Sequence, residues 1–227
     1  MHLIIIGCEY TGKTTLAAEI QQWMEKSMGG CESSFHDHFF PWDPADTSPK
    51  AKRIEVDLKL LTLNDPQVVE KYTRYVTYYH TNPSFYAKQD HCVVNWYYGD
   101  TVYGPLYYGF GGPGEVGDRQ VMARKYDSMI VQNAPDTVLV LMKADADVIR
   151  RRRSAMAQPQ PFPREEDIEL VQGLFESEFE RSLIGRRIVL DTSSTATAQE
   201  TLGEFVEQIQ PHLAAADRER IRTHLQE

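Results

Sequence analysis

The chain has few cysteines and no long apolar run. Its three cysteines, Cys8, Cys31 and Cys92, form an odd and scattered set, which argues against a disulfide framework or a zinc-binding spacing and favours reduced thiols. No stretch approaches the ~20 consecutive apolar residues that a membrane-spanning helix needs. The first predicted strand begins at residue 2, which leaves no room for a signal peptide. We therefore predict a cytoplasmic protein that makes no membrane contact.

Positive charge is also scarce. The formal net charge is −9 and the sequence pI is about 5.3, which argues against a general affinity for nucleic acid because such binding needs an excess of positive charge. Any anion site must therefore come from a local group of basic residues. The 227 residues suffice for one α/β domain with a buried core and are few for two domains.

Short β-branched runs alternate with helical patterns along the whole chain. Strands are predicted at 2–6, 34–40, 92–96, 137–142 and 187–191. Helices are predicted at 13–27, from 65, at 118–133, from 145, at 165–181, and towards the C-terminus over 197–225, while the glycine-rich stretch 104–117 is expected to be a mobile loop. This alternation predicts an α/β fold with a five-stranded parallel sheet flanked by helices.

The first predicted strand runs directly into the pattern G-x-x-x-x-G-K-T. Its two glycines allow a tight turn whose N–H groups point at an anion, and the following helix adds its positive end. In this Walker A pattern the lysine provides a charge for the phosphates and the first threonine a hydroxyl for Mg²⁺. The residues expected to bind a nucleoside triphosphate with Mg²⁺ are Gly7, Cys8, Glu9, Tyr10, Thr11, Gly12, Lys13, Thr14 and Thr15.

A carboxylate follows the second predicted strand. Asp37 lies in the segment FHDHFF, and in a parallel sheet ligands bind outside the carboxyl ends of the strands. Asp37 is thus a candidate to accept a proton from a substrate hydroxyl or to hold Mg²⁺ through water. The alternative is that Asp37 only caps a turn.

Four consecutive arginines end the helix that is predicted from residue 145. They are followed by the proline-rich stretch QPQPFP and then by Arg164. Phosphoryl transfer needs donors to the transferring group from outside the phosphate loop. We expect one of Arg151, Arg152 and Arg153, together with Arg164, to supply them from a lid at about residues 150–166. The alternative is a solvated face that complements the helix dipole.

Ten of the twelve tyrosines lie between residues 72 and 108. An aromatic-rich core is one explanation. The other is an aromatic pocket opposite the phosphate loop, since flat aromatic walls suit a nucleobase and an asparagine can hydrogen-bond a base edge. The substrate-binding candidates are Asp37, Phe39, Tyr75, Asn95, Trp96, Asp100 and Tyr103. Apolar tyrosines on one helix would also fit the face of a homodimer.

Taken in order, these segments resemble the thymidylate kinase and deoxynucleoside kinase group of P-loop kinases. The segments are GCEYTGKTT, DHFF, VVNWYYGDTVYGPLYYG, DADVIRRRR and PREEDIELVQGLFESEFE, and the likeness covers most of the chain. The resemblance implies a P-loop NTPase fold with a helical lid, formed by 1–227 as a single domain. It also implies an enzyme that transfers the γ-phosphoryl group of ATP, with Mg²⁺, to a nucleoside or nucleotide.

One departure from this group concerns the acceptor. Its members usually carry an acidic residue and an arginine at the end of the third strand, where this chain reads Val94-Asn95-Trp96. Asp100 is a candidate for the missing carboxylate. A monophosphate acceptor would need an arginine from elsewhere, namely Arg74, Arg119 or Arg124, whereas a nucleoside would not.

Other functions stay open at this point. The acceptor could be another small hydroxyl compound or phosphorylated metabolite, or the chain could be a nucleotide-dependent binding module without transfer activity. Transfer to water is disfavoured, because the aliphatic strand TVLVLM is followed by a lysine and not by the Asp-Glu pair typical of motor ATPases.

Overall fold

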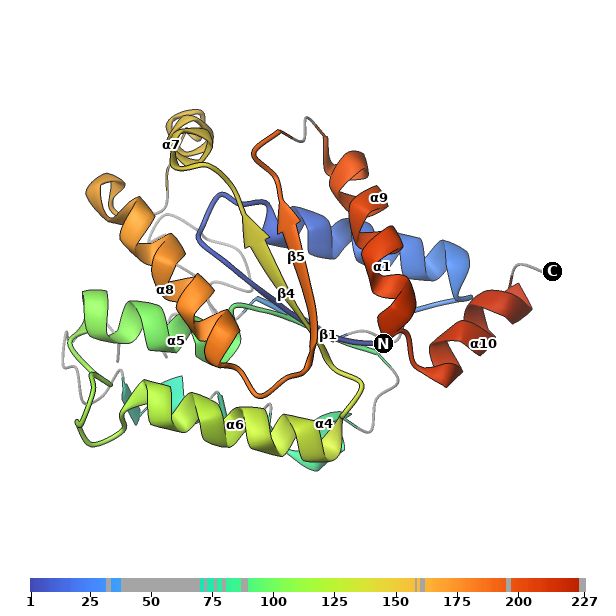
Figure 1. The fold of residues 1–227 in the computed structure, drawn as a ribbon, viewed down its shortest axis with the longest axis horizontal. Helices are drawn as coiled ribbons and strands as arrows, with labels where there is room; N and C mark the ends of the chain where they lie inside the picture. The colour runs from blue at the N-terminus through green and yellow to red at the C-terminus, as the bar shows by residue number, and fades with distance from the viewer. Residues whose placement is uncertain are drawn as a thin grey trace, which may run out of the picture.

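The computed structural model describes residues 1–31, 34–37, 70–71, 73–75, 77–78, 81–86, 90–157, 159, 162–194 and 197–224, with the backbone only at 34–37 and 84–85. Among these residues a parallel sheet runs through the centre of the molecule (Figure 1). Its strands are β1 (His2–Ile6), β2 (Ser34–Asp37), β3 (His91–Val94), β4 (Val138–Lys143) and β5 (Arg186–Asp191), in the order β2-β3-β1-β4-β5. The predicted α/β fold with a parallel sheet flanked by helices is confirmed.

Helices cover both faces of this sheet. The described ones are α1 (Lys13–Ser27), α4 (Pro83–Tyr86), α5 (Trp96–Tyr103), the π-helix Gly104–Tyr108, α6 (Arg119–Asn133), α7 (Ala146–Ser154), the 3₁₀ turn Glu165–Asp167, α8 (Ile168–Arg181), α9 (Ala198–Ile209), the 3₁₀ turn Gln210–His212 and α10 (Ala215–His224). Figure 1 shows α1, α9 and α10 on one side of the strands and α5, α6 and α8 on the other.

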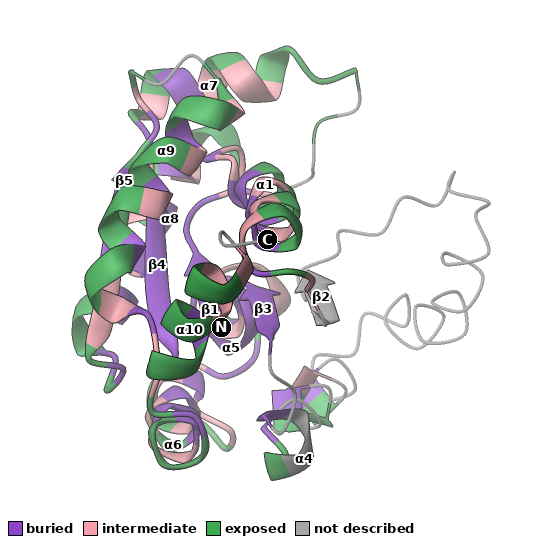
Figure 2. Cartoon of the chain, turned by 90° about the vertical axis from the view of Figure 1, so that its right-hand side faces the viewer, coloured by how far each residue is buried: buried purple, intermediate pink, exposed green. Residues whose placement is uncertain are grey.

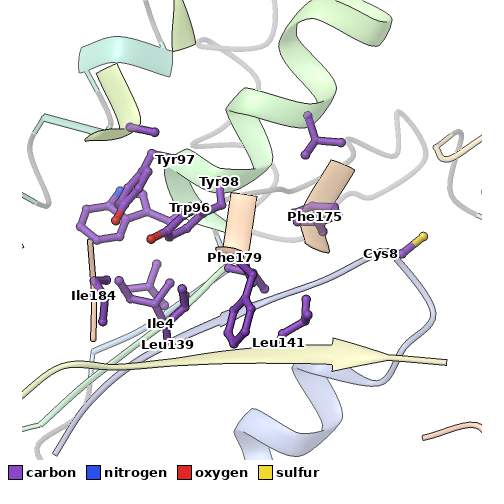
Figure 3. Packing of buried hydrophobic residues seen from close by; sticks show 14 of the residues in the cluster. Ile4, Cys8, Trp96, Tyr97, Tyr98, Leu139, Leu141, Phe175, Phe179 and Ile184 are labelled. Atoms are coloured by element: carbon purple, nitrogen blue, oxygen red, sulfur yellow. The ribbon is translucent and has the colours of Figure 1, made fainter. Parts of the chain in front are cut away.

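The central strands bury both of their faces. In β1, Ile4 and Ile6 pack with α5, α6 and α8, while Leu3 and Ile5 pack with α1 and α9. This double burial explains why the strand reads as a continuous apolar run. Figure 2 shows the buried strands enclosed by helices whose outer faces are exposed. Figure 3 shows Trp96, Tyr97 and Tyr98 above the sheet on the α5 side.

A buried carboxylate joins three helical segments on that side. Asp127 in α6 is fully buried and accepts hydrogen bonds from the Tyr97 hydroxyl at 2.5 Å and the Tyr98 hydroxyl at 2.7 Å. It also accepts the Leu183 N–H after α8 at 2.9 Å. Because a buried carboxylate is costly without donors, these three bonds fix α5 relative to α6 and α8. Two of the clustered tyrosines are thus part of the core.

Several predicted boundaries were wrong. The third strand ends at Val94, and α5 begins at Trp96, so a helix replaces the predicted end of the strand. The predicted loop 104–117 begins with the π-helix Gly104–Tyr108. A single helix over 197–225 is also wrong, because the turn Gln210–His212, which contains a proline, separates α9 from α10, whereas the separate short helix expected for the C-terminal tail is confirmed as α10.

The two predicted helix caps are confirmed. Thr197 and Glu200 form the reciprocal bonds of a capping box at the start of α9, and Asp118 accepts N–H bonds from the first turn of α6. All three cysteines are free. Within the ranges that the structure describes, no helix has both the length and the apolar character needed to cross a bilayer.

Candidate active site

The phosphate loop lies between β1 and α1, where the sequence pattern places it. Its backbone has positive φ at Gly7 (147°), Tyr10 (66°) and Gly12 (96°). A Cβ at Gly7 would lie 2.4 Å from the Met142 carbonyl oxygen, which is impossible without a shift of β4. Glycine is therefore required at position 7 by both its φ and the close approach of β4, and at position 12 by its φ.

The loop lysine points back over the loop. Lys13 is 4% exposed, and its ammonium donates to the Cys8 carbonyl at 2.7 Å and to Glu9 Oε2 at 3.3 Å. The Thr11 hydroxyl donates to the same Cys8 carbonyl at 2.8 Å. Burial raises the pKa of the Cys8 thiol to about 12, so this cysteine stays protonated and is not a nucleophile.

The start of α1 has the features of an anion site. Gly12 is the N-cap residue and provides no side-chain cap, so the first N–H groups of the helix are not used by a capping side chain. Thr14 and Thr15 are exposed in the first turn. Among the residues that are described, no group of three His, Cys, Asp or Glu side chains could hold a metal ion. A hydroxyl that shares Mg²⁺ with phosphates and water needs no such cage.

Of the four consecutive arginines, Arg152 contacts the phosphate loop. Its guanidinium donates to the Tyr10 carbonyl at 3.1 Å and to the hydroxyl and carbonyl of Thr192, both at 2.9 Å. Burial lowers the pKa of Arg152, and the neighbouring Arg151 lowers it further. The group is therefore a partly desolvated cation at the edge of the loop. In Figure 1 the arrowhead of β4 points towards α7, the helix that carries Arg152.

The other arginines have different surroundings. Arg151 is exposed, and Arg153 is half-buried with a buried Nε that has no hydrogen-bond partner among the described residues. Arg150 forms ion pairs with Asp147 and Glu169 on the outer surface. Arg164 is exposed, and its guanidinium carbon lies 5.4 Å from the centre of the Tyr107 ring.

A pocket of about 290 Å³ lies beside the phosphate loop. Its lining includes Tyr10, Thr15, Met142, Arg152, Thr192 and Thr201. The sequence interpretation missed Met142, Thr192 and Thr201 as site residues. The signal was present for Thr192, because it follows β5 and the carboxyl ends of all parallel strands meet at one edge of the sheet.

The structure describes only some of the residues that were predicted to bind the acceptor. Asp37 ends β2, where its backbone pairs with Val94 of β3, and its side chain lies outside the described atoms. Phe39 lies outside the described residues. Tyr75 is 69% exposed and lines a surface pocket of about 420 Å³ with residues of its own helical segment and Tyr126. No phosphate-loop residue lines that pocket.

Asn95 and Trp96 lie at the β3–α5 junction and Tyr103 ends α5, and all three are buried. Asn95 and Tyr103 contact Glu9 of the phosphate loop, so these two predicted acceptor residues touch the nucleotide motif itself. Trp96 packs in the apolar cluster on the α5 side of the sheet.

Asp100 belongs to a separate charged cluster. Its carboxylate lies 3.7 Å from Arg119 Nε, and Arg119 in turn binds Glu70 at 3.0 Å and the Thr73 hydroxyl at 2.8 Å. Burial raises the pKa of Asp100 to about 6, although Arg119 acts in the opposite direction. The sequence interpretation named Asp100 and considered Arg119, but it missed Glu70 as the residue that pairs with that arginine.

Comparisons with known proteins give a fold and no close relative. No protein-family model matches the chain, and no curated protein matches it in sequence. A thymidylate kinase from Ehrlichia chaffeensis superposes with a TM-score of 0.56 at 12% identity, over 92% of this chain and 98% of that one. Deoxyadenosine kinase from M. mycoides gives 0.52 at 12% identity with bound dCTP, over 93% and 100%. The same enzyme with bound dATP gives 0.50 at 11% identity, over 92% and 99%.

These solved structures share the arrangement of strands and helices described above. At 11–12% identity the likeness shows the fold and no substrate. The chain has the fold of the P-loop nucleoside and nucleotide kinases, as the resemblance of its segments predicts.

Proposed function

We propose that the protein is an ATP-dependent phosphotransferase that moves the γ-phosphoryl group to a nucleoside or nucleotide. The observation that carries this proposal is the phosphate loop, with its glycines at positive φ and a buried lysine, set in the fold of nucleoside and nucleotide kinases. Such a loop directs N–H groups and a cation at a polyphosphate.

The donor nucleotide is proposed to bind along the loop and in the adjoining pocket. Lys13 would exchange its contacts with Cys8 and Glu9 for the β- and γ-phosphates. The Thr14 hydroxyl would hold Mg²⁺, which neutralises charge on the phosphates when it is bound. The pocket of about 290 Å³ beside Arg152 would receive the rest of the nucleotide, with the Arg152 guanidinium already fixed by Tyr10 and Thr192.

The acceptor is proposed to bind at the carboxyl ends of β2 and β3. Asp37 would accept the proton of the attacking hydroxyl or hold Mg²⁺ through water. It ends β2 beside Val94, one residue before the junction that contacts the phosphate loop. The further substrate-binding residues of this proposal are Phe39, Tyr75, Asn95, Trp96, Asp100 and Tyr103.

The proposal includes a lid at about residues 150–166 on a single domain. Of Arg151, Arg152 and Arg153, the one proposed to close over the transferring group is Arg152, which contacts the phosphate loop, and Arg164 would close with it. The stacking of Phe162 on Tyr107, with ring centres 4.1 Å apart, supports a return of this segment to the body of the protein. The same proposal includes a homodimer through Tyr75 and Tyr78, which are 69% and 62% exposed. It also includes a cytoplasmic location.

The test is a transfer assay with γ-labelled ATP and Mg²⁺ against a panel of nucleosides and nucleoside monophosphates. Labelled product from at least one acceptor, absent with Lys13→Ala, is the expected result. ATP that binds but keeps its label across the panel would contradict nucleoside or nucleotide phosphorylation. Such a result would favour another hydroxyl metabolite as acceptor or a binding module.

A further inference from the structure

The backbone at the β3–α5 junction is unusual. Asn95 has φ 56° and ψ −54°, and Trp96 has φ 44°, a region that residues with a Cβ rarely adopt. Two backbone bonds hold the junction in place: the Asn95 N–H donates to the Ile5 carbonyl at 2.8 Å, and the Gly99 N–H donates to the Asn95 carbonyl at 3.1 Å. Asn95 thus continues the β1–β3 pairing and starts α5.

This conformation directs the Asn95 side chain at the phosphate loop. The residue is 1% exposed, and both ends of its amide are used. Oδ1 accepts the Gly7 N–H at 3.3 Å, and Nδ2 donates to Glu9 Oε1 at 3.0 Å. A single side chain therefore binds the first residue of the loop and the carboxylate two residues later.

Glu9 receives donors of two kinds. On Oε1 it accepts the Asn95 amide and the Tyr103 hydroxyl, the latter at 3.3 Å. On Oε2 it accepts the Lys13 ammonium at 3.3 Å. The neutral donors come from the body of the protein, while the charged donor is the lysine that a phosphate would need. Glu9 and a bound phosphate therefore compete for Lys13.

We infer that Asn95 is a positioning residue of the phosphate loop, which holds Gly7 and Glu9 so that Lys13 can leave Glu9 for an incoming phosphate. The inference rests on the proposed function, because it assumes that the loop binds a nucleotide. With Asn95 in place, the Glu9 carboxylate keeps two donors after Lys13 moves, so its desolvation stays compensated. Without the amide, Glu9 depends more strongly on Lys13 and holds it against the phosphate.

This role also accounts for the departure from the kinases that the sequence resembles. Where those have an acidic residue and an arginine, the present chain has a neutral amide beside an acidic loop residue. An arginine at position 95 could donate to Glu9 but could not accept the Gly7 N–H, and a carboxylate there could accept the Gly7 N–H but could not donate to Glu9. An asparagine provides the donor and the acceptor together.

The first test replaces Asn95 by glycine. Glycine adopts positive φ freely, so Asn95→Gly preserves the backbone of the junction and removes only the amide. The dissociation constant of ATP·Mg²⁺, measured by equilibrium binding without an acceptor, is expected to rise about tenfold, the effect of losing a hydrogen bond to a charged group. In the transfer assay the KM for ATP should rise in parallel with this dissociation constant.

The second test is a double-variant cycle between Asn95→Asp and Glu9→Gln. Asn95→Asp keeps the acceptor for Gly7 but sets a carboxylate against Glu9, and ATP·Mg²⁺ binding is expected to weaken by at least about tenfold. In the Glu9→Gln background the amide at position 9 can donate to the new carboxylate at position 95, so a hydrogen bond between the two side chains is kept. There the same Asn95→Asp change should alter the dissociation constant by less than about threefold. Thermal melting of each variant identifies any loss of folding.

Two results would overturn the inference. One is an Asn95→Gly protein that melts like the wild type and binds ATP·Mg²⁺ equally well. The other is an Asn95→Asp penalty of the same size in both backgrounds, because the effect would then not act through Glu9. A protein that binds ATP·Mg²⁺ but phosphorylates no acceptor contradicts the proposed function and leaves both binding comparisons decisive.

Discussion

The phosphate loop and the charged cluster around Asp100 are stabilised in different ways. In the phosphate loop, Thr11 and Lys13 bond to Cys8 and Glu9, which are three to five residues away. In the Asp100 cluster, Arg119 bonds to Glu70, 49 residues away in the chain. The turn of the loop is therefore held by bonds within its own short sequence, to which Asn95 and Arg152 add long-range bonds. The charged cluster exists only because α5, α6 and the segment that contains Glu70 are packed together.

The largest expected effect is a loss of activity on a substitution in the phosphate loop. Lys13→Ala removes the cation proposed for the phosphates, and we expect kcat/KM for ATP to fall by about a thousandfold or more, as for other preorganised charges in phosphoryl transfer. The transfer assay measures this loss, and circular dichroism should show an unchanged fold. Near-wild-type turnover in this variant would refute the assigned role.

A smaller loss of activity is expected for Arg152, which contacts the phosphate loop from a distant part of the chain. Arg152→Ala removes three hydrogen bonds to Tyr10 and Thr192, and kcat/KM for ATP should fall about a hundredfold, the effect of one preorganised donor. The matched control is Arg150→Ala, whose surface ion pairs with Asp147 and Glu169 contribute little. Its activity should stay within about twofold of the wild type. Equal losses in both variants would mean that the arginine run acts only through its total charge.

Substitutions in the charged cluster around Asp100 are expected to change the stability of the fold. Arg119 is 3% exposed in its side chain and lies between Glu70 and Asp100. Arg119→Met leaves two carboxylates without their shared cation, so the free energy of unfolding should fall by about 3 kcal/mol, as measured by urea denaturation. Arg74→Met is the control, because Arg74 binds the same Glu70 but is 45% exposed, and it should cost less than about 1 kcal/mol. If Arg119→Met lowers the free energy of unfolding no more than Arg74→Met does, the cluster does not hold the helices together.

The smallest effect concerns the protonation of Asp100. Because burial raises its pKa from 3.8 to about 6 in the folded protein, the folded state binds the proton more tightly than the unfolded state. This contribution to stability is present at low pH and is lost as the pH rises through about 4 to 6. Urea unfolding at pH 5 and pH 7 should therefore show a larger decrease with pH for the wild type than for Asp100→Asn. Identical pH dependences would place Asp100 in a less desolvated site.

The sequence predicts the elements whose determinants are local. The phosphate loop, the Asp118 cap and the Thr197 capping box are all found where their residues indicate, because each depends on bonds within a few positions. The helix α5 was missed for a physical reason. Seven of its residues are buried, so it has no polar face and shows no helical period.

The candidate site likewise has one part that depends on local sequence and another that depends on tertiary contacts. The sequence by itself determined the phosphate loop and the alternation of strands and helices, because glycine conformation, capping and apolar periodicity act over one or two turns. Only the tertiary structure decided which arginine touches that loop, because successive residues on α7 point in different directions and β5 decides which one meets Thr192. It likewise decided that Asn95 reaches Gly7 and Glu9 across 86 to 88 positions of the chain, a contact that depends on the packing of β3 against β1.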